Sequence, residues 1–303
     1  MDRLASIEVL VAVADAGSLS AAARRLGMPI ATVSRKLSDL ETHLRTRLLT
    51  RTNRGLRPTD VGADYIERCR RILDDLGEAE QAATGAFSAP AGTLMIAAPV
   101  LFGRLHVLPV VLDFLRAFPG IDVRLTLNDR VVDLHEERID VALRIASLPD
   151  SALIATRIGA LRRVICASPD FLALHGTPAE PIGLSALPCI AFESRTSRRV
   201  WVLGDGKSAV EVPVPIRLSV STAEAAVDAA AEGIGVTRVL SYQAADAVRD
   251  GRLRVVLRAW EPEPIPVHLL HAGDRMMPMK LRAFLDFATP RLRNRIAGLL
   301  PEG

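Results

Sequence analysis

The sequence is poor in lysine, in aromatic residues and in long apolar stretches. Only three of its 38 basic residues are lysines, a bias to which we assign no function because genome composition also produces it. Aromatic residues make up 4% of the chain, so leucine, valine, isoleucine and alanine must fill any core. No run of ~18 apolar residues occurs, which argues against a membrane-spanning helix.

Cysteine is also scarce, and the N-terminus has no basic segment leading into an apolar one. Cys69, Cys166 and Cys189 are odd in number and widely spaced, which argues against a disulfide framework and a cysteine-rich zinc site. A secretory signal has a pattern that this N-terminus lacks. We therefore expect a cytoplasmic protein with no membrane partner.

Common enzyme motifs are missing as well. The sequence contains no G-x-S-x-G, Walker A loop, H-E-x-x-H or paired C-x-x-C. Residues 233–238 begin like a dinucleotide fingerprint but have Arg238 at the third glycine position, and residues 204–207 fit a hairpin turn. His268 and His271 lie on a predicted strand and would point to opposite faces. We expect no catalytic residues, no metal and no cofactor.

What is present is a globular composition with an uneven charge. The 303 residues are 49% apolar and 24% charged, and at ~100 to 200 residues per domain they allow two or three domains. Residues 19–58 carry nine basic and two acidic residues, whereas residues 61–90 carry three basic and six acidic ones. Such a basic patch attracts phosphate backbones, although a solvated basic helix face explains the charge alone equally well.

The apolar spacing in this N-terminal region predicts three helices, at residues 4–16, 19–26 and 29–44. Ser18 suits the N-cap of the second helix, Gly27 its end, and Pro29 the first turn of the third. Two short helices joined by a tight glycine turn are typical of a helix-turn-helix, here at about residues 18–38. In that motif the N-terminal end of the second helix enters the major groove.

The third helix has an apolar stripe and is followed by a basic turn. The stripe consists of Val33, Leu37, Leu40 and Leu44. Residues 50–58, which contain Arg51, Arg54 and Arg57, predict a hairpin-like wing able to touch a DNA backbone or minor groove. A plain three-helix bundle would explain the stripe, but not the gathering of basic residues on the turn and wing.

Several motifs of the first sixty residues point to one family. They are Ser20-Ala21-Ala22-Ala23-Arg24-Arg25-Leu26, Thr32-Val33-Ser34-Arg35, Leu40-Glu41, Leu48-Leu49-Thr50-Arg51-Thr52-Asn53-Arg54 and Leu56-Arg57-Pro58-Thr59. With them the region resembles the winged helix-turn-helix of LysR-type transcriptional regulators. Residues 97–104, 128–134 and 139–144 resemble the effector domain of that family, so the resemblance spans essentially the full chain.

The resemblance implies an all-α winged helix-turn-helix at 1–60 that binds double-stranded promoter DNA. The expected DNA-binding residues are Ser20, Pro29, Ile30, Thr32, Ser34, Arg35, Lys36, Arg51, Thr52 and Arg54. Many family members have an amide side chain where residues 29–31 stand here. Base reading is therefore expected to depend on thymine-methyl contacts and on Arg35 or Lys36. Thr32 and Ser34 could instead contact phosphates, which sets register without reading sequence.

Residues 61–90 are expected to form a linker helix and hinge. The pattern predicts one long amphipathic helix at 60–87, and its acidic balance argues against contact with DNA. An isolated helix of this length would expose too much apolar surface, so a partner helix is expected. The resemblance implies that linker helices pair in a homodimer and that dimers pair into a tetramer.

Residues 91–303 alternate predicted strands and helices. Strands at 93–98 and 121–127 flank a helix that extends to about residue 118, so we expect helices packed on mostly parallel strands. The resemblance implies an α/β effector domain like a periplasmic binding protein, with subdomain I at about 91–162 and 267–303 and subdomain II at about 163–266. Other expected elements are a strand at 162–167, a helix opened by Ser168, a hairpin of 201–203 and 210–212, a helix opened by residues 221–224 and closed by Gly233, a strand at 268–270 and a helix at about 280–287.

Ligands of open α/β sheets bind beyond the carboxyl ends of the strands, where helix N-termini favour anions. The effector-binding residues expected from the sequence are Pro99, Val100, Leu101, Phe102, Ser221 and Thr222, and the resemblance adds Asn128, Ala146, Ser147, Phe192, Ser194, Gly235, Val236 and Thr237. Ser221 and Thr222 could equally serve only as helix caps. Family members often carry a hydroxyl residue where residues 99–101 stand here, so a common polar anchor is absent.

Three functions compete on this sequence. A transcriptional regulator controlled by a small-molecule effector explains the winged motif, the linker helix and the two-lobed domain together. A cytosolic solute-binding protein explains only the C-terminal part, and an enzyme with a helical module predicts a catalytic constellation that is missing. We favour the regulator; activation and repression both stay open, and an activator would also contact RNA polymerase.

Overall fold

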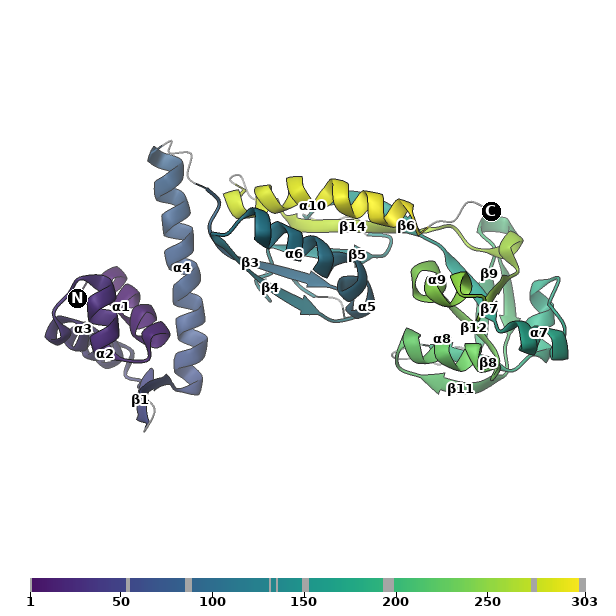
Figure 1. The fold of residues 1–303 in the computed structure, drawn as a ribbon, viewed down its shortest axis with the longest axis horizontal. Helices are drawn as coiled ribbons and strands as arrows, with labels where there is room; N and C mark the ends of the chain where they lie inside the picture. The colour runs from purple at the N-terminus through teal and green to yellow at the C-terminus, as the bar shows by residue number, and fades with distance from the viewer. Residues whose placement is uncertain are drawn as a thin grey trace. The chain divides into compact units, whose positions relative to one another are not determined.

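The computed structural model describes residues 2–52, 55–84, 89–130, 132–134, 136–148, 153–192, 199–273 and 277–299. The chain divides into two compact units, Met1–Thr93 and Leu94–Gly303. Figure 1 traces the elements of each unit, from the purple N-terminal helices to the yellow C-terminal helix.

The first unit is a three-helix module followed by a two-stranded hairpin and a long helix (Figure 1). Asp2 caps the first helix by accepting a hydrogen bond from the Ala5 N–H (3.2 Å). Ser18 caps the second by accepting one from the Ala21 N–H (3.2 Å), and Gly27 ends it with a φ of 63°, both as predicted. The elements are α1 (Arg3–Ala16), α2 (Leu19–Leu26), α3 (Ile30–Leu44), β1 (Leu49–Thr52), β2 (Gly55–Pro58) and α4 (Asp60–Thr84).

The core of this unit confirms the predicted apolar stripe of α3. Val33 and Leu40 are buried and pack in one cluster with Val9 and Leu10 of α1. Ile66 of α4 is buried in the same cluster. The first half of α4 is therefore part of the module and not a separate tether.

The predicted wing is an antiparallel hairpin of β1 and β2. Leu56 donates its backbone N–H to the Gly17 carbonyl (2.9 Å), which fastens β2 to the turn between α1 and α2. A Cβ on Gly55, whose φ is 112°, would lie 2.7 Å from that same Gly17 oxygen. Only glycine fits this close approach. Asn53 and Arg54, which the sequence places at the wing tip, lie outside the described residues.

The second unit contains two five-stranded sheets, and we call each sheet with its helices a lobe. Lobe I has the strand order β4-β3-β5-β14-β6, and three buried phenylalanines, Phe102, Phe114 and Phe284, fill its core. Its elements are β3 (Gly92–Ala98), α5 (Val100–Phe102), a π-helix (Gly103–Val107), α6 (Leu108–Ala117), β4 (Ile121–Leu127), β5 (Val141–Ile145), β6 (Leu153–Leu161), β14 (Ile265–Ala272) and α10 (Met279–Ala297).

Lobe II has the strand order β11-β8-β12-β7-β13 and a separate hairpin of β9 and β10, which was predicted. Ser168 caps α7 by accepting a hydrogen bond from the Phe171 N–H (3.3 Å), also as predicted. The elements are β7 (Arg163–Ala167), α7 (Pro169–His175), a 3₁₀ helix (Pro181–Ala186), β8 (Cys189–Phe192), β9 (Val200–Leu203), a 3₁₀ turn (Gly206–Ser208), β10 (Val210–Pro213), β11 (Ile216–Val220), α8 (Ala223–Ala231), β12 (Val236–Leu240), α9 (Ser241–Arg249), β13 (Arg254–Val256) and a 3₁₀ turn (Arg258–Trp260).

The expectation of mostly parallel strands is wrong, because both sheets are mixed. β14 runs antiparallel to β5 and β6, and β7 runs antiparallel to β12 and β13. The chain leaves lobe I through β6 and returns through β14, so these neighbouring strands run in opposite directions. That pairing joins segments about a hundred residues apart, and no local pattern reports it.

Two helices also differ from the sequence prediction. The helix after β3 is interrupted by a π-helical turn at Gly103–Val107. Helix α10 does not end near residue 287 but continues through Pro290 to Ala297. Phe284 and Ala288 before the proline and Leu292 after it are all buried, and this packing outweighs the hydrogen bond that proline removes.

Candidate nucleic-acid interface and interlobe cavity

The N-terminal end of α3 presents side chains to solvent. Pro29 is the N-cap and makes no side-chain capping bond, and Ile30 is 52% exposed. Ser34 and Arg35 are exposed one turn further along, while Thr32 and Lys36 are half-buried. Val33, Leu37 and Leu40 form the buried stripe of α3, and their packing in the core leaves these residues outside it.

The remaining predicted DNA contacts lie on α2 and on the wing. Ser20 on α2 is exposed, with its hydroxyl 3.4 Å from that of Ser18. Arg51 and Thr52 on β1 are exposed, and the Thr52 hydroxyl donates to the Gly55 carbonyl (3.0 Å). Arg54 was also expected to contact DNA and falls outside the described part of the chain.

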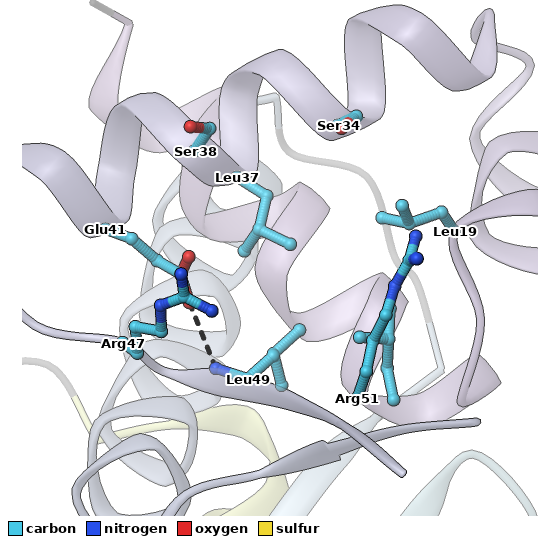
Figure 2. Close-up of a pocket in the computed structure, with 9 residues that line it drawn as sticks. Leu19, Ser34, Leu37, Ser38, Glu41, Arg47, Leu49 and Arg51 are labelled. Atoms are coloured by element: carbon cyan, nitrogen blue, oxygen red, sulfur yellow. Dashed lines mark hydrogen bonds between the residues drawn. The ribbon is translucent and has the colours of Figure 1, made fainter. Parts of the chain in front are cut away.

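A groove of about 240 Å³ separates α3 from the wing. Figure 2 shows Ser34 and Ser38 on α3 above it and Arg47 and Arg51 along the other side, with Arg51 extending toward Leu19. Sequence reasoning missed Arg47 and Ser38. Both were findable, since Arg47 belongs to the basic run and Ser38 is one helical turn beyond Ser34.

An acidic side chain closes one end of this groove. The Glu41 carboxylate oxygen Oε1 accepts hydrogen bonds from the backbone N–H groups of Leu48 (2.7 Å) and Leu49 (3.1 Å; Figure 2). Leu48 directly precedes β1 and Leu49 begins it, so the carboxylate joins α3 to the wing. Hydrogen bonds from N–H groups to a carboxylate are stronger than those to a neutral acceptor.

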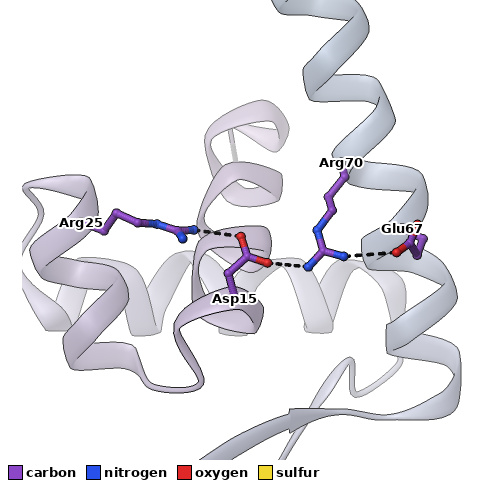
Figure 3. A network of polar contacts seen from close by, with 4 residues as sticks. All are labelled: Asp15, Arg25, Glu67 and Arg70. Carbon is purple, nitrogen blue, oxygen red and sulfur yellow. Dashed lines mark hydrogen bonds and ion pairs between the residues drawn. The ribbon is translucent and has the colours of Figure 1, made fainter. Parts of the chain in front are cut away.

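A second polar network ties three helices together (Figure 3). Asp15 on α1 pairs with Arg25 on α2 (3.2 Å) and with Arg70 on α4, and Arg70 also pairs with Glu67 (3.3 Å). Arg25 belongs to the basic patch, yet its charge is balanced by Asp15. Of the two arginines of α2, Arg25 therefore adds little to the positive face.

In the second unit, the two lobes enclose a cavity of about 420 Å³. Four of the predicted effector residues line it at strand ends: Pro99 after β3, Asn128 after β4, Ala146 after β5 and Phe192 at the end of β8. Backbone bonds position two of them, because the Asn128 N–H donates to Ala98 (3.0 Å) and the Ala146 N–H donates to Pro266 (3.1 Å).

The other residues predicted for this site lie elsewhere. Leu101 and Phe102 are buried in the lobe I core, and Val100 is partly exposed and donates its N–H to Asp129 Oδ1 (3.0 Å). Ser147 and Ser221 are exposed outside the cavity lining. Ser194 lies beyond the described residues.

Four further residues of the prediction serve the fold, one of them as a helix cap. The Thr222 hydroxyl accepts the Ala225 N–H (3.3 Å) as a cap of α8. Gly235, Val236 and Thr237 are buried at the start of β12, where the Thr237 hydroxyl donates to the Ile190 carbonyl (3.4 Å). The capping alternative thus describes Thr222 better than ligand contact does.

Sequence reasoning missed most polar groups of the cavity. They are Asp129, Arg130, Arg144, Arg163, Tyr242 and Gln243. Arg144 could have been found, because it is a charged residue near the carboxyl end of an apolar strand. Tyr242 and Gln243 carry no comparable signal. They lie at the start of α9 in lobe II, about a hundred residues along the chain from the cavity-lining residues of β5 in lobe I.

Tyr242 lies against lobe I through an aromatic cluster. Its ring centroid is 5.2 Å from that of Phe102 and 5.7 Å from that of His106, both in edge-to-face geometry. Burial raises the pKa of Tyr242, and burial together with the charge of Arg295 lowers the pKa of His106 to about 4. Both side chains are therefore neutral near pH 7.

Other reactive groups give no site in the described residues. Burial raises the pKa of Cys166 and of Cys189 to about 12, so neither thiol is activated. Within the described ranges no group of three His, Cys, Asp or Glu side chains is arranged to hold a metal ion. Among the helices described, none is long and apolar enough to cross a membrane.

Comparison with known proteins matches both units to one family. Residues 4–63 match "Bacterial regulatory helix-turn-helix protein, lysR family", and residues 88–293 match "LysR substrate binding domain". An HTH-type transcriptional regulator of Xanthomonas campestris is 35% identical over 288 residues, covering 94% of this chain and 84% of the relative. An HTH-type transcriptional repressor of Pseudomonas aeruginosa is 33% identical over 289 residues, covering 95% and 91%. The full-length structure of AphB, a Vibrio cholerae virulence activator, has 27% identity and a TM-score of 0.58, covering 94% of this chain and 98% of AphB.

Proposed function

The chain belongs to the LysR-type transcriptional regulators, and from this premise we propose which of its residues contact promoter DNA and which hold its effector. It is a DNA-binding regulator with an effector domain, not an enzyme. We assign DNA contact to the exposed start of α3 and to the wing. The observation that carries this is the exposure of Ile30, Ser34 and Arg35 outside the buried stripe of α3, with Ser34 on the same groove as the basic side chains of Arg47 and Arg51.

The roles of these residues follow from their chemistry. Arg35 and Lys36 suit base edges or phosphates, and the apolar Ile30 suits a thymine methyl group. Ser20, Thr32 and Ser34 suit phosphates, as do Arg51, Thr52 and Arg54 of the wing. Arg47 joins this set because it lies on the same groove.

We assign the effector to the interlobe cavity. Pro99, Asn128, Ala146 and Phe192 are kept as contacts, and Arg144, Arg163, Tyr242 and Gln243 are added. We withdraw direct contact for Leu101, Phe102, Gly235, Val236 and Thr237, which are buried in the lobe cores. A ligand in this cavity touches both lobes, so it shifts the protein toward whichever lobe arrangement binds it better.

The chain is further proposed to act in the cytoplasm as a dimer that pairs into a tetramer, with four winged domains on one promoter. Val61 is 60% exposed and Ile72 49% exposed on α4, and apolar side chains at such positions favour a partner helix. The relatives include a repressor and an activator. If this chain is an activator, it also contacts RNA polymerase.

The test is fluorescence anisotropy on labelled DNA from upstream of the protein's own gene, at two salt concentrations, against a scrambled duplex. We expect binding ~10³-fold tighter or more to the native sequence. If both duplexes instead bind weakly and equally, and salt abolishes the binding, the basic face attracts DNA only by nonspecific electrostatics. The contacts assigned to α3 and the wing would then be wrong, because these side chains would not read the promoter sequence.

A further inference from the structure

We propose that lobe I carries a second DNA-contacting surface, an arginine patch that holds the phosphate backbone without reading its sequence. The patch lies on the C-terminal half of α10 and on the two segments that flank this helix, the π-helical turn and β6. Its members are all exposed, and they are Arg104, Arg157, Arg291, Arg293 and Arg295. None of them lies in the winged domain, so these contacts are additional to those assigned above.

The packing of α10 on lobe I leaves its arginines in solvent. Leu292 and Ile296 are buried in the lobe core, and Arg291, Arg293 and Arg295, which alternate with them, are exposed. The helix, yellow in Figure 1, reaches these residues only because it continues through the proline at position 290. The same packing that outweighs the proline therefore creates the outer row of the patch.

Backbone carbonyls tie the outer row to both neighbouring segments. Arg293 donates a hydrogen bond from Nη2 to the Arg157 carbonyl on β6 (3.1 Å). Arg295 donates one from Nη2 to the Leu105 carbonyl in the π-helical turn (3.2 Å), directly beside Arg104. A carbonyl is a neutral acceptor, so each bond orients a guanidinium group without balancing its charge. The remaining N–H donors of each group stay available for an anion.

No carboxylate balances the patch in the part of the chain that the structure describes. Arg291 also donates to a neutral group, the Phe287 carbonyl (2.8 Å), and none of the five arginines forms an ion pair with a described side chain. The chain has 35 aspartates and glutamates, yet residues 103–107, 153–161 and 289–299 contain none. The patch is therefore a local excess of positive charge in a chain whose charges nearly cancel.

Two histidines of lobe I respond to this charge. Burial is the main reason why the pKa of His106 is lowered to about 4, and the charge of Arg295 lowers it further, against an opposing effect of Asp246 in lobe II. Burial and then the charge of Arg157 lower the pKa of His268. Both arginines thus act on their neighbours as positive charges that no nearby anion cancels.

Stabilisation of the helix end explains only one member of the patch. A cation in the last turn of a helix interacts favourably with the helix dipole, and Arg295 lies in that turn of α10. Arg104 and Arg157 belong to other elements and have no such role. The clustering of all five arginines therefore needs a second explanation.

The surface suits nucleic acid better than an acidic protein. The centre of a protein–protein interface is apolar, but no large apolar side chain is exposed at residues 103–107, 155–161 or 289–297. Protein–DNA interfaces are more polar and more positively charged. Guanidinium groups bind phosphate through paired N–H donors, and such contacts add affinity without sequence information.

The experiment measures how salt weakens DNA binding by the full-length chain. Fluorescence anisotropy follows binding to a scrambled duplex of ~60 base pairs, about six helical turns, at several salt concentrations. Each phosphate contact contributes ~0.9 to the slope of log K against log salt. The winged domain is the same in every variant, so a difference in slope reports on the substituted arginines.

Two triple variants with the same loss of charge are compared. The test variant is Arg291→Gln/Arg293→Gln/Arg295→Gln, and the control variant is Arg217→Gln/Arg252→Gln/Arg254→Gln. The control removes exposed arginines of lobe II, two of which lie on strands at opposite edges of its sheet, so it tests the effect of net charge without the patch.

We expect the slope of the test variant to be less steep by ~2 or more, and the slope of the control variant to match that of the unsubstituted chain. Lysines at the three test positions keep the charge and should restore most of the slope. Arg104→Gln/Arg157→Gln should reduce the slope by ~1 or more. That variant removes no side-chain hydrogen bond to a described residue, so it carries the test if the triple variant does not fold.

Equal slopes for the test variant and the unsubstituted chain would overturn the proposal. So would an equal change in the test and control variants, because net charge alone would then explain it. Labelled polyglutamate probes the acidic-protein alternative in separate titrations. If the test variant loses polyglutamate binding but keeps its DNA slope, the patch binds acidic protein and not DNA, and the proposal is wrong.

Failure of the proposed function would be seen separately. In that case the unsubstituted chain does not distinguish promoter DNA from the scrambled duplex. The slopes on the scrambled duplex still decide whether the arginine patch contacts DNA, because phosphate contacts do not depend on sequence.

Discussion

Glu41 accepts the backbone N–H of Leu48 at 2.7 Å, and so the last turns of the recognition helix hold the first strand of the wing. The same oxygen accepts the Leu49 N–H at 3.1 Å. Both leucines are buried, so water cannot replace this acceptor. This carboxylate therefore helps to set the spacing between α3 and the wing, and with it the shape of the groove between them.

Replacing that carboxylate tests its role. Glu41→Ala leaves two buried N–H groups without an acceptor, and we expect a loss of ~1 to 3 kcal/mol in the free energy of unfolding. Glu41→Gln keeps an oxygen acceptor and should lose less. Denaturant unfolding measures the change in the free energy of unfolding. Fluorescence anisotropy measures the affinity of each variant for promoter DNA. Glu8→Ala, an exposed glutamate of α1, is the control, and an equal result for the two alanine variants would contradict the assignment.

Asp15→Asn releases Arg25 and Arg70 from their shared partner (Figure 3). Partly exposed ion pairs contribute little, so stability should fall by ~1 kcal/mol or less. The freed Arg25 should strengthen nonspecific DNA binding and steepen its salt dependence by up to about one phosphate contact. Asp113→Asn removes an equal charge from an exposed pair in lobe I and should change neither property. Identical salt slopes for both variants would exclude this role for Asp15.

Arg35→Ala distinguishes base reading from phosphate contact. If Arg35 meets a base edge, the variant loses ~1 to 3 kcal/mol of discrimination between promoter and scrambled DNA. Arg57→Ala on the wing should weaken binding to both duplexes alike, because phosphate contacts carry no sequence information. If Arg35→Ala instead loses affinity for both duplexes equally, the Arg35 side chain contacts the DNA phosphate backbone and not a base.

The stability of the effector domain should depend on pH through His106. Its pKa is about 4 in the folded chain, because it is buried, against ~6.5 when unfolded. Between these values the unfolded chain binds a proton that the folded chain does not, so stability is lost as pH falls through this window. Burial lowers the pKa of His268 also, which adds a loss of the same sign.

His106→Phe should therefore flatten the dependence of the free energy of unfolding on pH between about 6.5 and 4, without abolishing it. Unfolding is measured at closely spaced pH values for both proteins. An unchanged slope would mean that His106 binds its proton equally in the folded and the unfolded chain.

Cys166 and Cys189 should not react with thiol reagents or peroxide in the folded chain. Both are fully buried with pKa values of about 12, so the reactive thiolate is absent near pH 7. Thiol reagents should modify them in denaturant but not in native buffer, as mass spectrometry can show. Peroxide should leave promoter binding unchanged; a peroxide effect that Cys166→Ser or Cys189→Ser removes would establish redox control instead.

Local elements could be predicted because their signals are local. Ser18, Gly27 and the stripe containing Val33 are read within a few residues, and the structure has the corresponding cap, helix end and buried face. Pro290 is the exception, because the packing of Leu292 and Phe284 on the lobe core continues a helix that the local rule ends.

The sequence by itself determined the helices and wing of the first sixty residues, several elements beyond them and the resemblance that led to the family, since caps, periodicity and motifs are contiguous. Tertiary structure alone decided the mixed sheets and the composition of the interlobe cavity. Arg144 lies on β5 in lobe I, whereas Arg163 and Tyr242 lie on β7 and α9 in lobe II, and only the folded chain places all three on one cavity. A cavity depends on distances between segments far apart in the chain, and a one-dimensional pattern does not contain those distances.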